Sequence, residues 1–282
     1  MNKTLIKEFF LIIGCKLIKI LLFLKCYYLI SLILRIFIFK NKKISANDKN
    51  RKNIIVLTKT SGLQDLLYAF KSQNITNIVI YELPRILIKE IFYFFLRDKV
   101  IDYNYHINDK NLDTLKKKYE KTLTKIFFHL KKFLTIDLII GFNAFYMAEI
   151  ELRKAAKNNS IHFLVLHKEN IYSPIENLFL KFMYSNLNHC FDGKKLLVYS
   201  ENEKNLFLEA KLVKKKDIEV VGIPRTDSSI NLRKTKPKKI ILYFMIEENR
   251  GFPQHLINLI KRTDKLTKKL SKNFENKPSY KY

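Results

Sequence analysis

The chain has 282 residues, which is long enough for one large domain or two modest ones. Its hydrophobic content of 48% with 13% aromatic residues supplies a packed core and excludes a wholly disordered protein. The 53 Lys and Arg residues outnumber the 26 Asp and Glu residues, and a net charge of +27 favours a polyanionic partner. The lysines are scattered, with no arginine-rich arm or zinc-finger spacing, so an anionic membrane surface is favoured over nucleic acid.

Cysteine and histidine residues give no sign of a metal site. The three cysteines, Cys15, Cys26 and Cys190, form neither a disulfide framework nor a C-x-x-C pattern, which fits a reducing, cytoplasmic setting. Five histidines also lack metal-ligand spacing: His106, His129, His162, His189 and His255. We therefore expect no bound metal.

Residues 1–40 form a hydrophobic segment that is predicted to associate with a membrane. A spanning helix needs about 20 predominantly apolar residues. The stretch 20–39 has this length, although Lys25 and Arg35 interrupt it near its two ends. Three alternatives stay open: a spanning helix, a helix in the plane of the headgroups, or a helix buried in the core of the protein itself. We expect membrane attachment and leave its mode undecided.

A basic linker follows at residues 41–52. Basic residues next to an apolar segment place the following chain on the cytoplasmic side of the membrane, here the inner membrane. The lysines that interrupt the apolar run, and the lack of a small-residue cleavage site after it, argue against a secretory signal peptide. The flanking basic residues are Lys40, Lys42, Lys43, Lys49, Arg51 and Lys52.

Strands and helices then alternate through residues 53–234. The predicted strands cover residues 53–58, 75–82, 136–141, 161–166, 196–200 and 218–221. The predicted helices cover residues 84–96, 111–134, 144–158, 175–187 and 203–211, and another begins near residue 61. This alternation predicts an α/β fold with one Rossmann-like domain around a parallel, doubly wound sheet.

Residues 235–282 contain one further predicted strand at 239–245 and one helix at 254–270. A second Rossmann-like domain needs about 100–150 residues. We therefore expect an incomplete second domain, which packs on the first, remains mobile, or is completed by a partner chain.

Polar residues follow three of the predicted strands. Ligands bind beyond the carboxyl ends of strands in open α/β sheets, so these residues form a candidate site. Ordinary turns, solvated loop residues or a structural salt bridge are the competing interpretations, and the glutamates of the 144–158 helix are expected to be solvated. The candidates are Gly141, which ends the 136–141 strand, and Asn143 after it, His167, Lys168 and Glu169 after the 161–166 strand, and Arg225 and Asp227 after the 218–221 strand.

Three segments together resemble a known family. They read LHKEN at 166–170, DGKKLLVYSENEKNLF at 192–207 and VVGIPRTD at 220–227. Their succession is similar to that in surface-carbohydrate and capsule-polysaccharide biosynthesis proteins, which are related to the CDP-glycerol glycerophosphotransferases and have a GT-B glycosyltransferase-like fold. The resemblance covers residues 130–245.

This resemblance implies a transferase without a bound cofactor or metal. The activated donor, a nucleotide sugar or a CDP-polyol, is a substrate, and the acceptor is a glycan or a lipid-linked molecule. His167 or Glu169 would remove the proton from the acceptor hydroxyl. The remaining candidates would bind substrate: Lys168, Gly141, Asn143, Arg225 and Asp227.

Two alternatives of a different class remain. The chain could be a non-catalytic protein that binds a glycan or a partner enzyme at the membrane surface. It could also be a truncated, inactive relative of the transferases, because residues 235–282 are few for a donor-binding domain.

Overall fold

A computed structural model describes most of the first 224 residues. The described ranges are 3–41, 51–58, 60–72, 77–97, 105–106, 109–167, 180–182, 184–185, 187 and 190–224. They belong to one compact unit that spans Met1–Ser228. The strand and helix expected within 235–282, most of the helix expected at 175–187, and Lys168, Glu169, Arg225 and Asp227 lie outside the described residues.

The described strands form one seven-stranded sheet in the order β1-β3-β2-β4-β5-β6-β7. The strands are β1 (Phe39–Lys40), β2 (Lys52–Leu57), β3 (Ile78–Leu83), β4 (Leu138–Gly141), β5 (His162–Leu166), β6 (Lys195–Val198) and β7 (Ile218–Val220). All neighbours pair in parallel except β1, which pairs antiparallel with β3. The mostly parallel sheet confirms the α/β prediction, and β1 is an addition to it.

The helices of the α/β region begin and end close to their predicted bounds. They are α3 (Thr60–Ser72), α4 (Arg85–Leu96), α6 (Lys110–Phe133), α7 (Met147–Asn158) and α9 (Glu201–Glu209), with a 3₁₀ turn at Lys215–Asp217. Side chains cap two of them: Asp109 accepts from the backbone N–H groups of Asn111 and Leu112, and Ser200 accepts from that of Glu203. Pro84, expected at the first helical position, precedes α4 as its N-cap.

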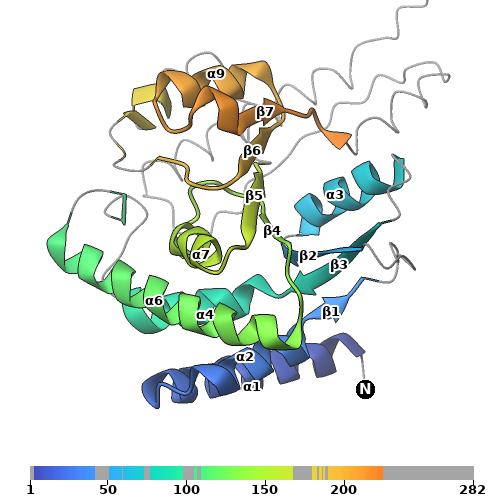
Figure 1. Ribbon diagram of the computed structural model, residues 1–282, viewed down its shortest axis with the longest axis vertical. Coiled ribbons are helices and arrows are strands. Elements are labelled where there is room, and N and C mark those ends of the chain that lie inside the picture. Colours follow the sequence, from blue (N-terminus) through green and yellow to red (C-terminus); the bar gives the residue numbers. More distant parts are fainter. Residues whose placement is uncertain are drawn as a thin grey trace, which may run out of the picture. The chain divides into compact units, whose positions relative to one another are not determined.

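The two faces of the sheet are covered by different helices (Figure 1). Because side chains alternate along a strand, Ile54 and Val56 of β2 pack with Leu66 of α3, whereas Ile55 and Leu57 face the cluster that includes α4, α6 and α7. In the strand order, β3 lies next to β2 on one side, and β4 lies next to β2 on the other side. The strand order therefore reverses between β2 and β4, and such a reversal is where doubly wound sheets bind ligands.

The amino-terminal hydrophobic segment forms two helices, α1 (Lys3–Phe23) and α2 (Tyr27–Phe37). The chain turns between them at Lys25, whose φ of 56° lies in the left-handed region. Residues 20–39 therefore do not form one continuous helix. This contradicts the alternative in which that stretch is a single membrane-spanning helix. None of the helices in the described ranges has both the length and the apolar character needed to cross a membrane.

Candidate functional site

The structure brings together three of the predicted site residues at the carboxyl ends of β4 and β5. Gly141 ends β4, and the Asn143 side-chain oxygen accepts a hydrogen bond from the Phe145 N–H at 2.8 Å. His167 follows β5, and its Nδ1 atom accepts a hydrogen bond from the Ala144 N–H at 3.0 Å. The turn after β4 and the imidazole after β5 therefore form one local structure.

The His167 side chain is held on several sides. Its relative exposure is 2%, and its ring packs edge-on against Phe145 and Phe207. The Nε2 atom lies 3.7 Å from a carboxylate oxygen of Glu203. Because Nδ1 accepts the Ala144 N–H, the neutral ring carries its proton on Nε2, which faces that carboxylate. In this arrangement the lone pair on Nδ1 already accepts the hydrogen bond from Ala144. The imidazole therefore connects the β4–α7 turn to α9.

Glu203 is fixed by the start of α9. Ser200 and Glu203 have the spacing of a capping box, in which a helix-start hydroxyl and a glutamate three residues later bond to nearby backbone N–H groups. The Ser200 hydroxyl accepts from the Glu203 N–H at 3.2 Å, and the Glu203 carboxylate accepts from the Tyr199 N–H at 3.2 Å. The polar helix start at 200–203 thus positions the carboxylate that faces His167.

A second polar pair lies on the α3 side of the same edge. The Tyr199 hydroxyl donates to a carboxylate oxygen of Asp65 at 2.6 Å, and both side chains are buried. The pair joins α3, which follows β2, to the carboxyl end of β6. Asp65 was not among the sequence candidates, since it lies within a predicted helix and not directly after a strand.

A third pair lies beside the reversal of the strand order. Arg85 begins α4 after β3, and its Nε atom is 2.7 Å from the Glu149 carboxylate in the first turn of α7. The guanidinium carbon is 3.5 Å from the centre of the Tyr146 ring. A Cβ atom at Gly141 would lie 2.5 Å from the same carboxylate. The Glu149 carboxylate thus leaves no room for a larger side chain at residue 141. Arg85 was missed, although its place just after β3 obeys the rule that selected the other candidates.

Both glutamates of α7 were expected to be solvated, and both are buried. Glu149 is 1% exposed and pairs with Arg85 as described. Glu151 is also 1% exposed, and its Oε2 atom has no hydrogen-bond partner among the described residues. Burial raises the pKa of Glu151, Lys154 at 3.5 Å offsets only part of that increase, and the resulting pKa is about 7. The sequence prediction was wrong for both residues because neighbouring elements cover this side of α7.

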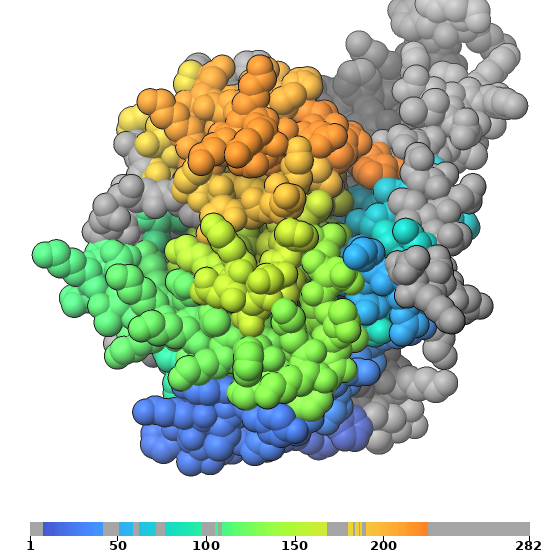
Figure 2. Space-filling view, viewed as in Figure 1, coloured from blue at the N-terminus to red at the C-terminus, as the bar shows by residue number. Residues whose placement is uncertain are grey.

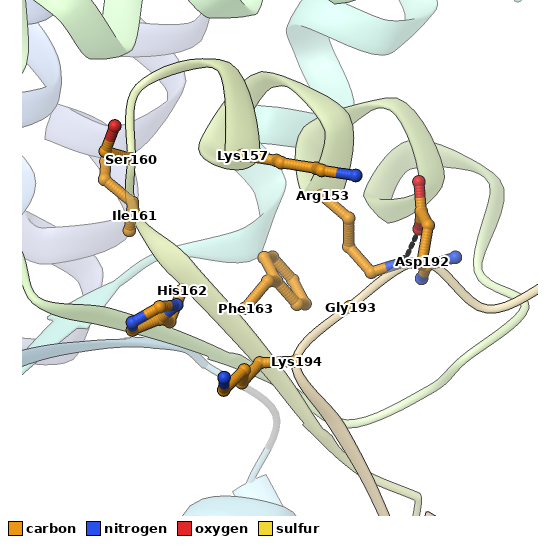
Figure 3. A pocket seen from close by; sticks show the side chains of 9 residues that line it. All are labelled: Arg153, Lys157, Ser160, Ile161, His162, Phe163, Asp192, Gly193 and Lys194. Carbon is orange, nitrogen blue, oxygen red and sulfur yellow. Dashed lines mark hydrogen bonds and ion pairs between the residues drawn. The ribbon is translucent and has the colours of Figure 1, made fainter. Parts of the chain in front are cut away.

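The opposite, amino-terminal edge of the sheet contains a cavity of about 400 Å³ (Figure 3). In Figure 3 the Arg153 side chain points toward Asp192, and its Nε atom is 3.0 Å from the carboxylate. Its Nη1 atom donates to the Ala144 carbonyl at 2.9 Å, so Arg153 also supports the turn that holds His167. The lining residues are Arg153, Lys157, Ser160, Ile161, His162, Phe163, Asp192, Gly193 and Lys194.

The fold and its carboxyl edge define a doubly wound α/β protein with three polar pairs near the carboxyl ends of its strands, each with at least one buried side chain. Among the described residues, no group of three His, Cys, Asp or Glu side chains could hold a metal ion. Comparison with known proteins finds no matching family model, no matching curated protein and no matching solved structure.

Proposed function

We propose that the carboxyl edge binds the acceptor in a glycosyltransferase-like protein of surface-polysaccharide biosynthesis. The described unit would be the amino-terminal half of a GT-B fold, placed at the cytoplasmic face of the inner membrane. The observation that carries the proposal is the convergence of Gly141, Asn143 and His167 at one edge, next to the strand-order reversal. A crevice at that position is where a sheet of this type binds ligands.

The proposed reaction transfers a sugar or polyol phosphate from a nucleotide-activated donor to an acceptor hydroxyl. The hydroxyl must lose its proton as the new bond forms, and the nucleotide leaves with the electrons of the broken bond. The lone pair of His167 is bonded to the Ala144 N–H, so His167 acts as a positioning residue in this arrangement. Glu169, two residues further along the chain, then takes the proton.

Basic groups would stabilise the negative charge that develops on the departing phosphate. By the sequence resemblance these groups are Lys168 and Arg225, with Asp227 as a further substrate contact. The donor itself would be bound by a second domain or by a partner chain.

The burial of His167 favours a second candidate function. His167 is 2% exposed, and both of its nitrogens face protein groups. Such a residue is suited to holding two parts of the fold together. If Glu169 also performs no chemistry, the unit is a non-catalytic protein that binds a glycan, a lipid-linked acceptor or a partner enzyme at the membrane surface.

Transfer assays on the full-length protein separate the two candidates. Membranes that contain the protein are supplied with radiolabelled nucleotide sugars or CDP-glycerol, and label in the glycan fraction is measured. The transferase predicts that Glu169→Gln lowers transfer by about 10²–10⁴-fold, the usual effect of removing a general base. Glu201→Gln, an exposed carboxylate at the start of α9, is the matched control and should leave transfer unchanged.

Each result decides between the candidates. Transfer that falls in Glu169→Gln but not in Glu201→Gln supports the enzyme. Acceptor binding without transfer of label from any donor supports the non-catalytic protein. Full transfer in Glu169→Gln would contradict the assignment of Glu169 as the base.

A further inference from the structure

Helix α1 exposes a broad apolar face. Phe23 is 79% exposed and Ile20 is 57% exposed, which is unusual for side chains of this size. At helical spacing these residues and their neighbours share the side of α1 that points away from the protein. This surface, called here the outer face of α1, comprises Phe9, Phe10, Ile12, Ile13, Leu17, Ile20, Phe23 and Leu24, with the exposed Lys16 among them.

The opposite side of α1 is packed against the protein. Ile18 and Leu22 are buried in the main core, and Lys19 forms an ion pair of 2.9 Å with Glu90 of α4. Figure 2 shows the blue amino-terminal helices as a strip along the edge of the molecule next to α6. The other side of α1 exposes large apolar side chains that lie next to one another, and a large exposed apolar surface marks an interaction site. The outer face is therefore expected to bind another apolar environment.

The apolar surface extends from α1 onto α4. Glu90 lies four residues from both Ile86 and Phe94, so these three side chains share one face of α4. The ion pair between Lys19 and Glu90 brings α1 against that face. Ile86 is 44% exposed and Phe94 is 40% exposed, so both enlarge the apolar surface beside α1.

The amino-terminal segment that contains this surface is strongly basic in sequence. Glu8 is the only acidic residue within 3–41. Long lysine side chains beside an apolar surface can keep their ammonium groups in a polar layer, and here that layer would be lipid phosphate. The basic residues of the same range are Lys3, Lys7, Lys16, Lys19, Lys25, Arg35 and Lys40.

We propose that the outer face of α1 lies in the headgroup layer of an anionic bilayer, with the helix axis parallel to the membrane plane. The proposal rests on the membrane location proposed above and is independent of the transfer chemistry. It specifies an in-plane mode, because a helix packed along one side against α2 and α4 cannot be surrounded by lipid. A second copy of the chain is less suited to the surface, since two chains of net charge +27 repel each other.

Vesicle binding tests the surface. Purified full-length protein is mixed with vesicles of phosphatidylcholine, with or without phosphatidylglycerol, and the bound fraction is measured by flotation. We expect binding to the phosphatidylglycerol vesicles. The double variant Ile20→Ser/Phe23→Ser should bind at least about tenfold more weakly, because it removes two large apolar side chains from the lipid.

The control is Phe128→Ser. Phe128 is 56% exposed, close to the 57% of Ile20, but it lies on α6 beside Lys131 and Asn158. This variant should bind vesicles as the wild type does. Circular dichroism of all variants in the absence of lipid checks that they remain folded.

Tryptophan fluorescence measures the orientation of the helix, because the natural chain contains no Trp. Single-Trp proteins are made as Phe9→Trp and Phe23→Trp, at opposite ends of the outer face. Their positions are about 21 Å apart along a helix. A helix in the membrane plane places both at the same shallow depth of one leaflet, so lipids brominated near the headgroup and present only in the outer leaflet should quench both equally. A spanning helix would place the two positions toward opposite leaflets, so these lipids would quench only one of them.

The outcomes separate this proposal from the membrane location itself. Loss of vesicle binding in the double variant alone, with equal quenching at positions 9 and 23, supports the in-plane face. Unchanged vesicle binding in the double variant, or unequal quenching, would contradict the proposal that the outer face of α1 lies in the headgroup layer. Either result would leave the membrane location itself in place. No binding of the wild type to anionic vesicles overturns both. A concentration-dependent dimer that the double variant dissociates, with equal vesicle binding, would assign the face to a second copy.

Discussion

Replacing Glu151 with Gln should stabilise the protein at neutral and alkaline pH. The Glu151 carboxyl group is buried, and its pKa in the folded protein rises from 4.5 to about 7. The folded state therefore holds a proton that the unfolded chain releases between these two pH values, and stability must fall as pH rises through this window. Below about pH 4.5 the group is protonated in both states and imposes no penalty.

The size of the effect follows from the pKa shift. Each unit corresponds to about 1.4 kcal/mol, so a rise from 4.5 to about 7 predicts a penalty of roughly 3 kcal/mol above pH 7. Glu151→Gln removes the ionisable group. The variant should be more stable than the wild type at pH 8, and the two should converge near pH 4.5.

Urea unfolding followed by circular dichroism at a series of pH values measures the difference. Glu149→Gln on the same helix is the contrasting variant, because Glu149 pairs with Arg85 at 2.7 Å and its loss should destabilise the protein. The reasoning would be refuted if Glu151→Gln were less stable than the wild type at pH 8, or if the difference between them did not change with pH.

Three further variants test the contacts around the carboxyl edge. Arg85→Met leaves the Glu149 carboxylate buried without its cation and should lower the free energy of unfolding by about 3–5 kcal/mol; a cost below that of Glu149→Gln would show that the carboxylate finds another partner. Gly141→Ala places a Cβ atom 2.5 Å from that carboxylate and should cost about 1–3 kcal/mol in urea unfolding, and an unchanged urea midpoint would show that the carboxylate moves aside freely. His167→Ala removes the acceptor of the Ala144 N–H and should raise the hydrogen-exchange rate of that amide; unchanged exchange would refute the connecting role of His167.

The sheet was predictable because its strands are short apolar runs separated by polar turns. The apolar run at 161–166, with polar residues on both sides of it, predicted the start of β5 to within one residue. β1 was not predictable in this way, since a two-residue strand has no periodicity. The turn at Lys25 was also missed, because its left-handed backbone occurs at a residue other than glycine.

The positions of His167 and Asn143 at the carboxyl edge were predictable, but their packing was not. The end of β5 correctly placed His167 at the carboxyl edge, beside Asn143 and the turn after β4. Its burial comes from Phe145 and Phe207, which are remote in sequence, and no local pattern reports such contacts. The sequence analysis therefore found where polar residues meet but could not show which of them are engaged with one another.

Hydrogen exchange tests the central claim that the carboxyl edge binds the acceptor. The full-length protein is compared with and without a lipid-linked glycan fraction extracted from membranes, and backbone protection is measured by mass spectrometry. The proposed function predicts slower exchange in residues 141–146, which include Asn143 and the turn held by His167. Slower exchange at residues 192–195, beside the cavity at the amino edge, with no change at 141–146, would contradict it.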